Sequence, residues 1–410
     1  MDQGEKKGLG KNINLYLTAN LLISFAYGIF MMFAALYLKE VGYGENFVGK
    51  MLSSHTLSTA IFSVFGAYLV GRIGKKKSIL IGIFGLFFGM LLMVKVDSSY
   101  LIIMMGILSG FGYAIKNTVE AMFLTENAPI ESRVLAFSMN FTAMNLGMTS
   151  SNLMGGFISD FLSNYLGSVG ALSAVLSMGG FIVLIAAIPV LMLHENKIIH
   201  RRTVSEYLLG YKNILISSKS ANRFLLFNGT IGMGAGMVVP FFSVYLKYSL
   251  NVDDSIVGSI LSFSQFGCVL GGLLIPVLVG KIGAHRAIVL CQLLSIPFLI
   301  SIAFPQGILL IAISFFMRSS LMNMAFPLIQ NIGMEMVHPL DRANLSSLMS
   351  LSGNLTRALG ISVGGFIMEN YSYNMPYYFT VGLYLIATSM FVFMFKGEVL
   401  RKESPTYGAS

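Results

Sequence analysis

The chain has 410 residues, of which 55% are hydrophobic and 11% are charged, and its mean hydropathy is +0.75. Soluble domains carry roughly 25% charged residues, so this composition predicts a protein embedded in lipid. The formal net charge is +9, but the basic residues lie in short loops between apolar segments. This distribution argues against a nucleic-acid-binding protein, which needs its basic residues on one soluble face.

The cysteines and the first residues exclude further classes. Cys268 and Cys291 both fall inside apolar segments, which predicts packing roles and leaves neither a disulfide framework nor a metal cluster. Residues 1–11 are polar and basic, and the apolar run that follows is too long for the core of a signal peptide. We expect this run to remain as the first membrane helix.

Polar, charged or Gly- and Pro-rich breaks divide the sequence into apolar segments of about 20 to 27 residues, enough to span a bilayer. Segments this long and this continuously apolar are helices rather than barrel strands. The fold class is therefore an all-α polytopic membrane protein with twelve transmembrane helices. We expect them at residues 14–38, 46–71, 78–96, 99–124, 133–160, 169–193, 222–246, 254–280, 286–304, 307–333, 342–368 and 375–396.

One long polar stretch separates the sixth segment from the seventh. It carries six basic residues, namely Lys197, Arg201, Arg202, Lys212, Lys219 and Arg223. We therefore expect an N-terminal six-helix half at residues 1–193, a cytoplasmic linker at 194–223, a C-terminal half at 224–396 and a cytoplasmic tail at 397–410.

The basic residues also predict the orientation. Twenty of the 27 Lys and Arg residues lie in the loops on the side of the termini and the linker. The opposite loops hold only Lys39, Lys50, Lys95 and Lys247. Because cytoplasmic loops carry an excess of Lys and Arg, we expect both termini in the cytoplasm and the protein in the cell membrane.

The second half of the chain repeats the first. Residues 155–158 and 364–367 both read Gly-Gly-Phe-Ile, which is an offset of 209. The same offset pairs further residues, Val70 with Val279, Glu126 with Glu335, Arg133 with Arg342, and Asn145 with Asn354. Before the second segment the offset is 208, so Asn20 pairs with Asn228. Two homologous halves in parallel topology place a substrate site near the bilayer midplane between them.

The loop after the second segment reads Gly71-Arg72-Ile73-Gly74-Lys75-Lys76. Gly74 permits a tight turn, and the cations can pair with carboxylates or helix C-terminal carbonyls. This motif is similar to a cytoplasmic signature of the major facilitator superfamily, and the helix count, orientation and repeat resemble that superfamily over residues 14–396. Gly71 and its equivalent Gly280 stand where the signature has Asp, so one anion expected at the inner gate is missing.

The resemblance implies a cytoplasmic gate. In the superfamily, Glu and Arg pairs after the fourth and tenth helices join the basic residues of the signature and close the inner end of the outward-facing state. The residues that match are Arg72, Lys75, Glu126, Arg133, Lys281, Glu335 and Arg342. The alternative is that these are ordinary cytoplasmic loop charges.

Four charged residues fall inside the expected helices, where charges are rare and costly and are therefore functional candidates. Lys116 and Glu120 lie four residues apart, so they share a helix face and can neutralise one another. With Arg318 and Arg357 they leave an excess of two positive charges, which an anionic substrate would balance. The alternative is a structural role, with Lys116 paired to Glu120 and Arg357 paired to a carbonyl or to Glu369.

In the superfamily the first, fourth, seventh and tenth helices line the cavity, which adds hydrogen-bonding candidates. These are Asn20, Tyr27, Tyr113 and Asn228. An isolated Asn in a membrane helix also serves helix packing, and this interpretation is favoured for the symmetry-paired Asn145 and Asn354. His55 could titrate near neutral pH, although packing against another helix is the favoured interpretation.

The fifth segment bears on drug export. Residues 147–156 resemble the antiporter signature of drug exporters, but Ser151-Asn152 replaces its Gly-Pro. The kink-forming Pro is missing, which argues against antiport. The 27 Met and 32 Phe residues keep drug export open, because they can build an adaptable apolar pocket.

The resemblance implies a secondary active transporter that moves a small organic solute by alternating access, with an anion as the candidate class and proton coupling through Glu120. The alternatives are a multidrug or metabolite efflux antiporter and, more remotely, a membrane sensor or receptor without transport. No catalytic constellation, metal site, cofactor motif or ATP-binding glycine loop is found, so no enzyme is expected. The expected partners are the substrate, protons and the lipid bilayer, and the chain is expected to be a monomer.

Overall fold

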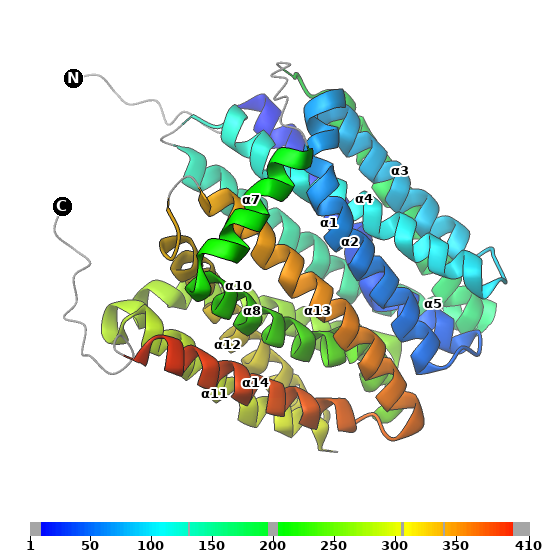
Figure 1. Ribbon diagram of the computed structural model, residues 1–410. Coiled ribbons are helices and arrows are strands. Elements are labelled where there is room, and N and C mark those ends of the chain that lie inside the picture. The colour runs from blue at the N-terminus through cyan, green and yellow to red at the C-terminus, as the bar shows by residue number, and fades with distance from the viewer. Residues whose placement is uncertain (1–9, 130–131, 196–203, 305–306, 339–340, 397–410) are drawn as a thin grey trace, which may run out of the picture.

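A computed structural model describes residues 10–129, 132–195, 204–304, 307–338 and 341–396 (Figure 1). Within these ranges no strand occurs. The first helices are α1 (Lys11–Glu40), α2 (Glu45–Ile73), α3 (Lys75–Met93), α4 (Ser99–Asn127), α5 (Arg133–Ile185), α6 (Ala187–Leu191) and α7 (Val204–Ser217). The later ones are α8 (Lys219–Val238), η2 (Val239–Phe241), α9 (Phe242–Val244), η3 (Tyr245–Ser249), α10 (Asp254–Ile282), α11 (Ala284–Ala303), α12 (Ile308–Glu335), α13 (Arg342–Asn370) and α14 (Met375–Met394).

The helices agree with an integral membrane protein. Among the described residues, nine helices are long and apolar enough to cross a membrane. The stretch Leu135–Leu191 is one of them and covers two expected segments, whereas α2 and α13 are not among the nine. The number of twelve spans therefore stays a prediction.

Two local findings refine the expected segments. Within the bounds of α5, Gly167 has a φ of 71° and a ψ of 168°, which are not helical. Two helices therefore meet at Gly167, where a residue with a side chain would be strained. The expected linker contains a helix, because α7 occupies Val204–Ser217. Its Tyr211 and Ile214 are buried against the helices of the second half, and α8 begins at Lys219.

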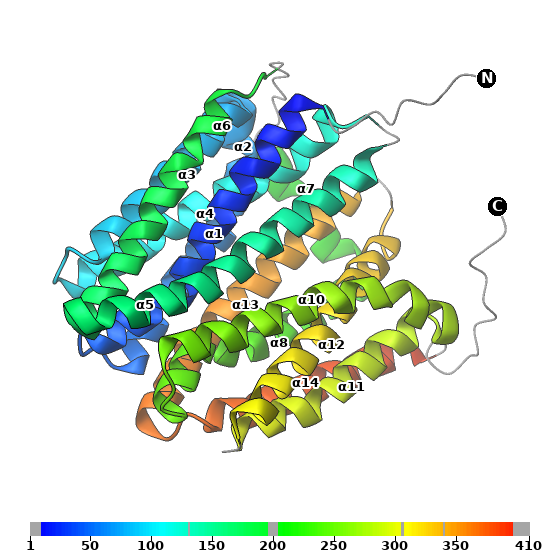
Figure 2. The same cartoon turned by 180° about the vertical axis from the view of Figure 1, so that it is seen from behind.

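The helices pack in two groups. In the first group α1 packs on α5, and α4 packs on α2 and α3. In the second group α8 packs on α13 and α14, and α12 packs on α10 and α11. The groups meet mainly where α2 lies along α13 and α5 lies along α10 (Figures 1 and 2).

The two groups of helices contact each other more closely at one end of the molecule than at the other. We call the end that holds Lys11 and Met394 the terminal end, and the opposite end, where α1 ends and α2 begins, the distal end. The groups converge at the distal end, at the lower right of Figure 1. Most hydrogen bonds and ion pairs between the groups in the described ranges lie toward the distal end, where α1, α2 and α5 meet α9, η3, α10 and the end of α13.

The turns after α2 and α10 show the repeat in the backbone. Gly74 has a φ of 89° and Gly283 a φ of 81°, a region that glycine adopts without a steric penalty. The expected tight turn at Gly74 is thereby confirmed, and its equivalent 209 residues later has the same geometry.

Candidate functional site

A cavity of about 220 Å³ lies between the two groups of helices. We call it the central cavity. The first group contributes Tyr27, Met31, Leu52, His55, Thr56, Thr59 and Tyr113, and the second contributes Pro240, Asn354, Arg357 and Ile361. Three of the expected site residues, Tyr27, Tyr113 and Arg357, therefore line one cavity.

Aromatic side chains from three helices form one wall of the central cavity. The rings of Tyr27 and Tyr113 stack with centroids 3.7 Å apart and planes 6° apart. His55 lies beside them, with its ring centroid 5.9 Å from that of Tyr27. Its Nδ1 is 2.9 Å from the hydroxyl of Ser109, whereas its buried Nε2 has no hydrogen-bond partner. The imidazole is thus held on one side and unsatisfied on the other.

Among the described residues that line the central cavity, Arg357 alone is charged. No hydrogen bond or ion pair joins its guanidinium to another residue in the part of the chain that the structure describes. Glu369, one partner considered for it, instead accepts a hydrogen bond from the backbone N–H of Asn46 at 2.7 Å. Arg357 is half-buried, so water hydrates its charge only in part, and this site favours a negative charge beside it.

Lys116, Glu120 and Asn20 belong to a second polar cluster inside the first group, which we call the Glu120 chain. Lys116 forms an ion pair with one carboxylate oxygen of Glu120. The other oxygen accepts a hydrogen bond from Asn140 at 2.8 Å, and Asn140 in turn accepts one from Asn20 at 2.6 Å. The chain joins α1, α4 and α5, and the expected neutralisation of Lys116 by Glu120 is confirmed.

No such chain occurs among the described residues of the second group. The positions 209 residues after Lys116, Glu120 and Asn140 are Ala325, Ile329 and Met349, which are buried in an apolar cluster. Asn228, the equivalent of Asn20, donates a hydrogen bond to the backbone carbonyl of Met349 at 2.7 Å. The repeat keeps the contact between these two helices but not the ionisable groups.

Arg318 belongs to neither cluster, but it lies close enough to Arg357 for the two positive charges to repel each other. It is buried on α12, donates a hydrogen bond to the hydroxyl of Tyr384 at 3.1 Å and stands 5.3 Å above the ring of Phe242. These contacts are a polar partner and a cation–π contact. No carboxylate pairs with Arg318 among the described residues, and it does not line the central cavity.

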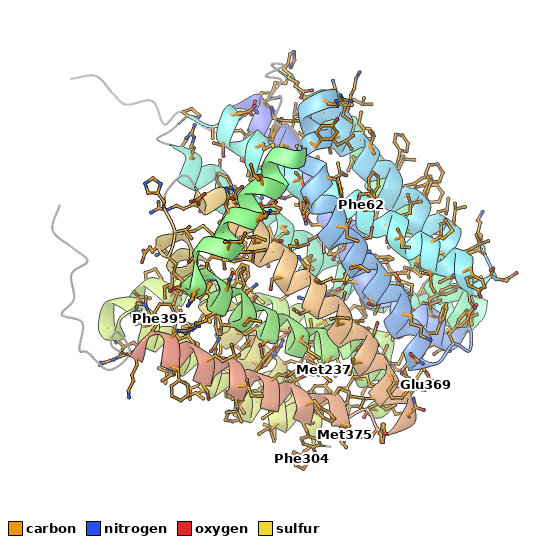
Figure 3. All side chains as sticks on the ribbon, in the orientation of Figure 1. Phe62, Met237, Phe304, Glu369, Met375 and Phe395 are labelled. Atoms are coloured by element: carbon orange, nitrogen blue, oxygen red, sulfur yellow. The ribbon has the colours of Figure 1, made fainter. Side chains whose placement is uncertain are left out.

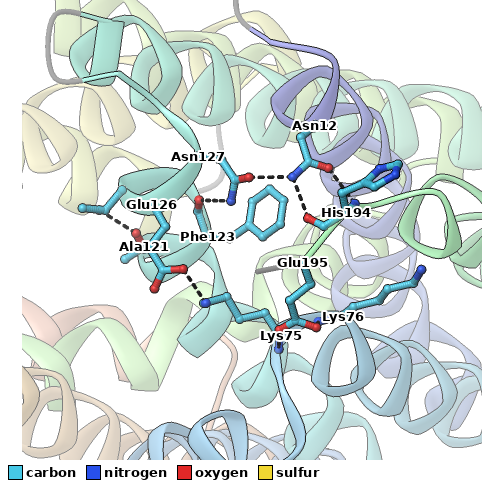
Figure 4. A network of polar contacts seen from close by, with 10 residues as sticks. Asn12, Lys75, Lys76, Ala121, Phe123, Glu126, Asn127, His194 and Glu195 are labelled. Atoms are coloured by element: carbon cyan, nitrogen blue, oxygen red, sulfur yellow. Dashed lines mark hydrogen bonds and ion pairs between the residues drawn. The ribbon is translucent and has the colours of Figure 1, made fainter. Parts of the chain in front are cut away.

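The predicted gate residues of the first half lie at the terminal end (Figure 4). Lys75 forms an ion pair with Glu126, while the backbone N–H groups of Lys75 and Lys76 donate to Glu195. Glu195 thus caps the N-terminus of α3. Asn12 bridges Asn127 and the backbone of His194. All of these contacts stay within the first group.

The other predicted gate residues also keep to their own group. Arg72 stacks over Tyr68 with its guanidinium carbon 5.2 Å from the ring centroid, and Arg342 donates to the carbonyl of Met334 at 3.1 Å. Glu335 accepts from Asn331 at 3.0 Å. Arg133 and Lys281 form no ion pair within the described ranges. A network that closes the terminal end in another conformation stays a prediction.

At the distal end two carboxylates cap helices of the opposite group, and we call this arrangement the distal latch. Asp160 of α5 accepts hydrogen bonds from the backbone N–H groups of Asp254 and Ser255 at 3.1 and 2.9 Å, at the start of α10. Glu369 of α13 accepts from Asn46, at the start of α2, and its side chain marks the distal end in Figure 3. Asp160 and Glu369 are 209 residues apart, so the repeat forms both caps.

Glycines allow the backbones to approach at the latch. A Cβ on Gly49 of α2 would lie 3.0 Å from the carbonyl oxygen of Ile361, and one on Gly258 of α10 would lie 2.2 Å from that of Asn152. Both glycines and both carbonyls are related by the offset of 209. Such contacts permit close helix packing in a membrane.

Basic and phenolic side chains complete the latch. Lys39 pairs with Glu45 at 2.6 Å, and Lys247 pairs with Asp254 at 2.8 Å and with Glu40 at 3.4 Å. Tyr373 donates to Glu45 across the two groups. Burial and the Glu45 carboxylate raise the pKa of Tyr373 well above its usual range, so its hydroxyl keeps the proton that it donates.

Sequence reasoning missed several of these residues. His55 and Asn354 were interpreted as packing residues, yet both line the central cavity. Asn140, Glu195, Asp160 and Glu369 were not singled out as site residues at all. For the latch a signal existed, because the offset of 209 pairs Asp160 with Glu369 and Glu45 with Asp254.

A bundle of apolar helices with a cavity between two groups is an arrangement typical of helical membrane transport proteins. A family model described as Major Facilitator Superfamily matches residues 16–212 and 224–409. The chain therefore belongs to the major facilitator superfamily, whose members are transporters rather than enzymes.

The chain is similar to several named members. It is 24% identical over 323 residues to the multidrug resistance protein MdtG of Dickeya zeae (strain Ech586), covering 75% of each chain. It is 21% identical over 295 residues to the multi-drug resistance efflux pump PmrA of Streptococcus pneumoniae, covering 70% of this chain and 71% of the relative. The crystal structure of the nucleoside transporter NupG shares its fold, with a TM-score of 0.78 at 15% identity, covering 94% of this chain and 99% of that one.

Proposed function

We propose that this protein is a secondary active transporter that moves a small organic solute through the central cavity by alternating access, coupled to protons. It crosses the cell membrane twelve times as a monomer of two six-helix halves, residues 1–193 and 224–396, with both termini in the cytoplasm. The observation that carries the proposal is that both groups of helices line a single cavity. A site shared by two bodies changes its access when they rock against each other.

The contacts at the two ends support a state that is closed at the distal end. The distal latch joins the groups through Asp160 and Glu369, whereas the predicted gate residues at the terminal end contact only their own group. With the termini in the cytoplasm, this conformation faces inward. The opposite state requires the latch to open and the gate residues to meet across the groups.

Glu120 is the proposed proton carrier. It is the only described carboxylate in the interior of a membrane helix, and it is held by Lys116 and Asn140. Protonation of Glu120 would leave Lys116 as an unpaired cation, which is costly at this depth. A change in the Glu120 proton therefore changes the energy of the helices that the chain joins.

Alternating access can be tested without knowing the substrate. Thr56 lines the central cavity, and Cys268 and Cys291 can be replaced by Ser so that Thr56→Cys is the only thiol. In proteoliposomes, a membrane-impermeant maleimide should label this thiol from both faces. Val41→Cys, on an exposed distal residue, is the matched control and should label from one face only. Labelling of Thr56→Cys from one face under all conditions would contradict the proposal.

Efflux of several drugs is the second candidate, because MdtG and PmrA carry multidrug names. Met31, Leu52 and Ile361 give the cavity an apolar side that suits lipophilic compounds. The two candidates differ in a resistance assay. Overexpression should leave sensitivity to lipophilic cations unchanged for a solute transporter and should lower it for a multidrug pump.

A further inference from the structure

We infer that the central cavity takes a small organic monoanion with a flat apolar body, whose negative charge pairs with Arg357. This inference rests on the proposed function and adds the class of substrate to it. Three features of the cavity carry it, namely the unpaired guanidinium, the unsatisfied nitrogen of His55 and the aromatic wall.

The charge of the ligand follows from the charges of the cavity. Of the eleven lining residues only Arg357 is charged, and none is a carboxylate. The carboxylate of the neighbouring α4 residue Glu120 is already engaged by Lys116 and Asn140. A cationic ligand would meet Arg357 with no anion to offset it, whereas an anion would relieve the cost of the unpaired charge. Arg357 is the one cation among the lining residues, so one negative charge on the ligand suffices to pair with it.

A hydrogen-bonding position lies on the other group of helices. The hydroxyl of Ser109 donates its proton to the carbonyl of Gly106, so Nδ1–H of His55 donates to that hydroxyl. The buried Nε2, which has no partner, is then an acceptor for an N–H or O–H group of the ligand. A buried polar atom without a partner is destabilising unless something bonds to it. Because His55 belongs to α2 and Arg357 to α13, a ligand that contacts both joins the two groups of helices.

The body of the ligand follows from the walls and the volume. Tyr27 and Tyr113 present a stacked aromatic pair, against which a flat ring packs in an offset or edge-on geometry. Met31, Leu52 and Ile361 add apolar surface. The volume of about 220 Å³ lies below the range of about 300 to 1,000 Å³ typical of pockets for drug-sized ligands, so the ligand is small.

Three naphthalene derivatives that differ in charge test the inference. They are 2-naphthalenesulfonate, the neutral 2-naphthalenesulfonamide and the cationic 2-naphthyltrimethylammonium. The sulfonate stays ionised, so it does not cross the bilayer as a neutral acid. Equilibrium binding of each radiolabelled probe is measured on the full chain in lipid nanodiscs, with protein-free nanodiscs as the blank. The sulfonate should bind at least about 10-fold more tightly than the amide, and the ammonium should bind least.

Variants then locate the charge. Arg357→Gln should reduce the preference for sulfonate over amide to less than about 2-fold, while Arg357→Lys should keep most of it. The control Arg223→Gln makes the same change at an exposed residue of α8 and should behave as wild type. His55→Phe should weaken the amide, whose N–H groups can donate to Nε2, and should leave the sulfonate, which has no donor, nearly unchanged. If Arg357→Gln does not fold, two results still test the inference: the ratio of sulfonate to amide affinity in Arg357→Lys, and the affinities of the three probes for the wild type.

The outcomes separate this inference from the proposed function. Equal binding of the amide and the sulfonate, or tighter binding of the ammonium, would overturn the ligand class and leave transport standing. An anion preference that survives Arg357→Gln would overturn the assignment of the site. Counterflow of the sulfonate into proteoliposomes tests movement separately. Tight sulfonate binding without counterflow would overturn transport of this class and leave the binding site standing.

Discussion

Residues related by the internal repeat keep the same chemistry at the distal end of the molecule but not at its centre. At the distal end the repeat preserves the chemistry, because Asp160 and Glu369 cap opposite helices with the same offset of 209 residues. In the centre it does not, because the residue equivalent to Glu120 is the apolar Ile329. Contacts that join two similar halves can be made twice, once by each half. A single ligand or proton needs only one copy of the side chain that binds it.

This difference assigns separate tasks to the two regions. The latch consists of backbone N–H groups and carboxylates at helix ends, where an anion is favoured by the helix dipole. The central groups are buried charges in membrane helices, where each must find a partner. We therefore expect substitutions in the centre to change what is transported and coupled. Substitutions at the latch should change how the two conformations are populated.

The largest effect is expected at Glu120. Glu120→Gln removes the proposed proton site and leaves Lys116 buried without a counterion, which destabilises the fold by about 3 kcal/mol or more. Accumulation of 2-naphthalenesulfonate driven by a pH gradient in proteoliposomes should fall more than about 10-fold, while counterflow without a gradient should persist.

The double variant Lys116→Met, Glu120→Gln separates stability from coupling. It removes both charges, so the stability should recover while gradient-driven accumulation stays low. Full gradient-driven accumulation in Glu120→Gln would show that Glu120 is not the coupling group.

The next effect is expected at the distal latch. Loss of a side-chain cap costs about 1 kcal/mol, so Asp160→Ala with Glu369→Ala should shift the balance between conformations by about 30-fold. Spin labels at Val41 and Ser372, one on each group, report the separation by double electron–electron resonance in a background without Cys268 and Cys291. A longer distance should appear in the double variant.

The matched control is Asp97→Ala, which removes an exposed carboxylate at the same end. Its side chain caps no helix of the opposite group, so its distance distribution should match that of wild type. A double latch variant with an unchanged distribution would mean that the caps do not hold this end closed.

A smaller difference in stability is expected between variants of Asn20 and of its repeat equivalent Asn228. Asn20→Leu removes the donor to Asn140 and loosens the Glu120 chain, whereas Asn228→Leu loses one bond to a helix carbonyl. We expect losses of about 2 and about 1 kcal/mol. Thermal unfolding can be followed by a thiol-reactive dye, because Cys268 and Cys291 are buried. Equal losses would mean that the hydrogen bond from Asn20 to Asn140 does not stabilise the rest of the Glu120 chain.

The smallest effect is expected for Glu126→Gln at the terminal end. The side chain of Glu126 is 35% exposed and that of its partner Lys75 is 8% exposed. Water reaches the pair from the Glu126 side and can hydrate the end of Lys75 in the variant, so we expect a loss of about 1 kcal/mol or less. Unfolding temperatures should therefore hardly change. A loss comparable to that of Glu120→Gln would show that the terminal-end contacts stabilise the first group as strongly as the centre does.

Sequence patterns predicted the fold well and the site in part. The apolar segments and the repeat identify the superfamily, and the glycine turn at Gly74 is confirmed. The spacing of Lys116 and Glu120 predicted their pairing, because residues four apart share a helix face. The spacing could not predict that Asn140, from another helix, holds the second oxygen of Glu120.

The same limit applies to the central cavity. Arg318 and Arg357 are alike in sequence, since both are single cations in apolar segments. Only the packing of α12 and α14 gives Arg318 the hydroxyl of Tyr384, and only the meeting of α2 and α13 leaves Arg357 and His55 in one cavity.

By itself, therefore, the sequence determined that the chain is a repeated bundle of membrane helices, because hydropathy, loop charge and offset are properties of segments. The tertiary structure decided which buried groups are partnered, since partners come from helices far apart in the chain. It also decided which end of the bundle is joined, because the caps of the distal latch exist only when two groups of helices meet.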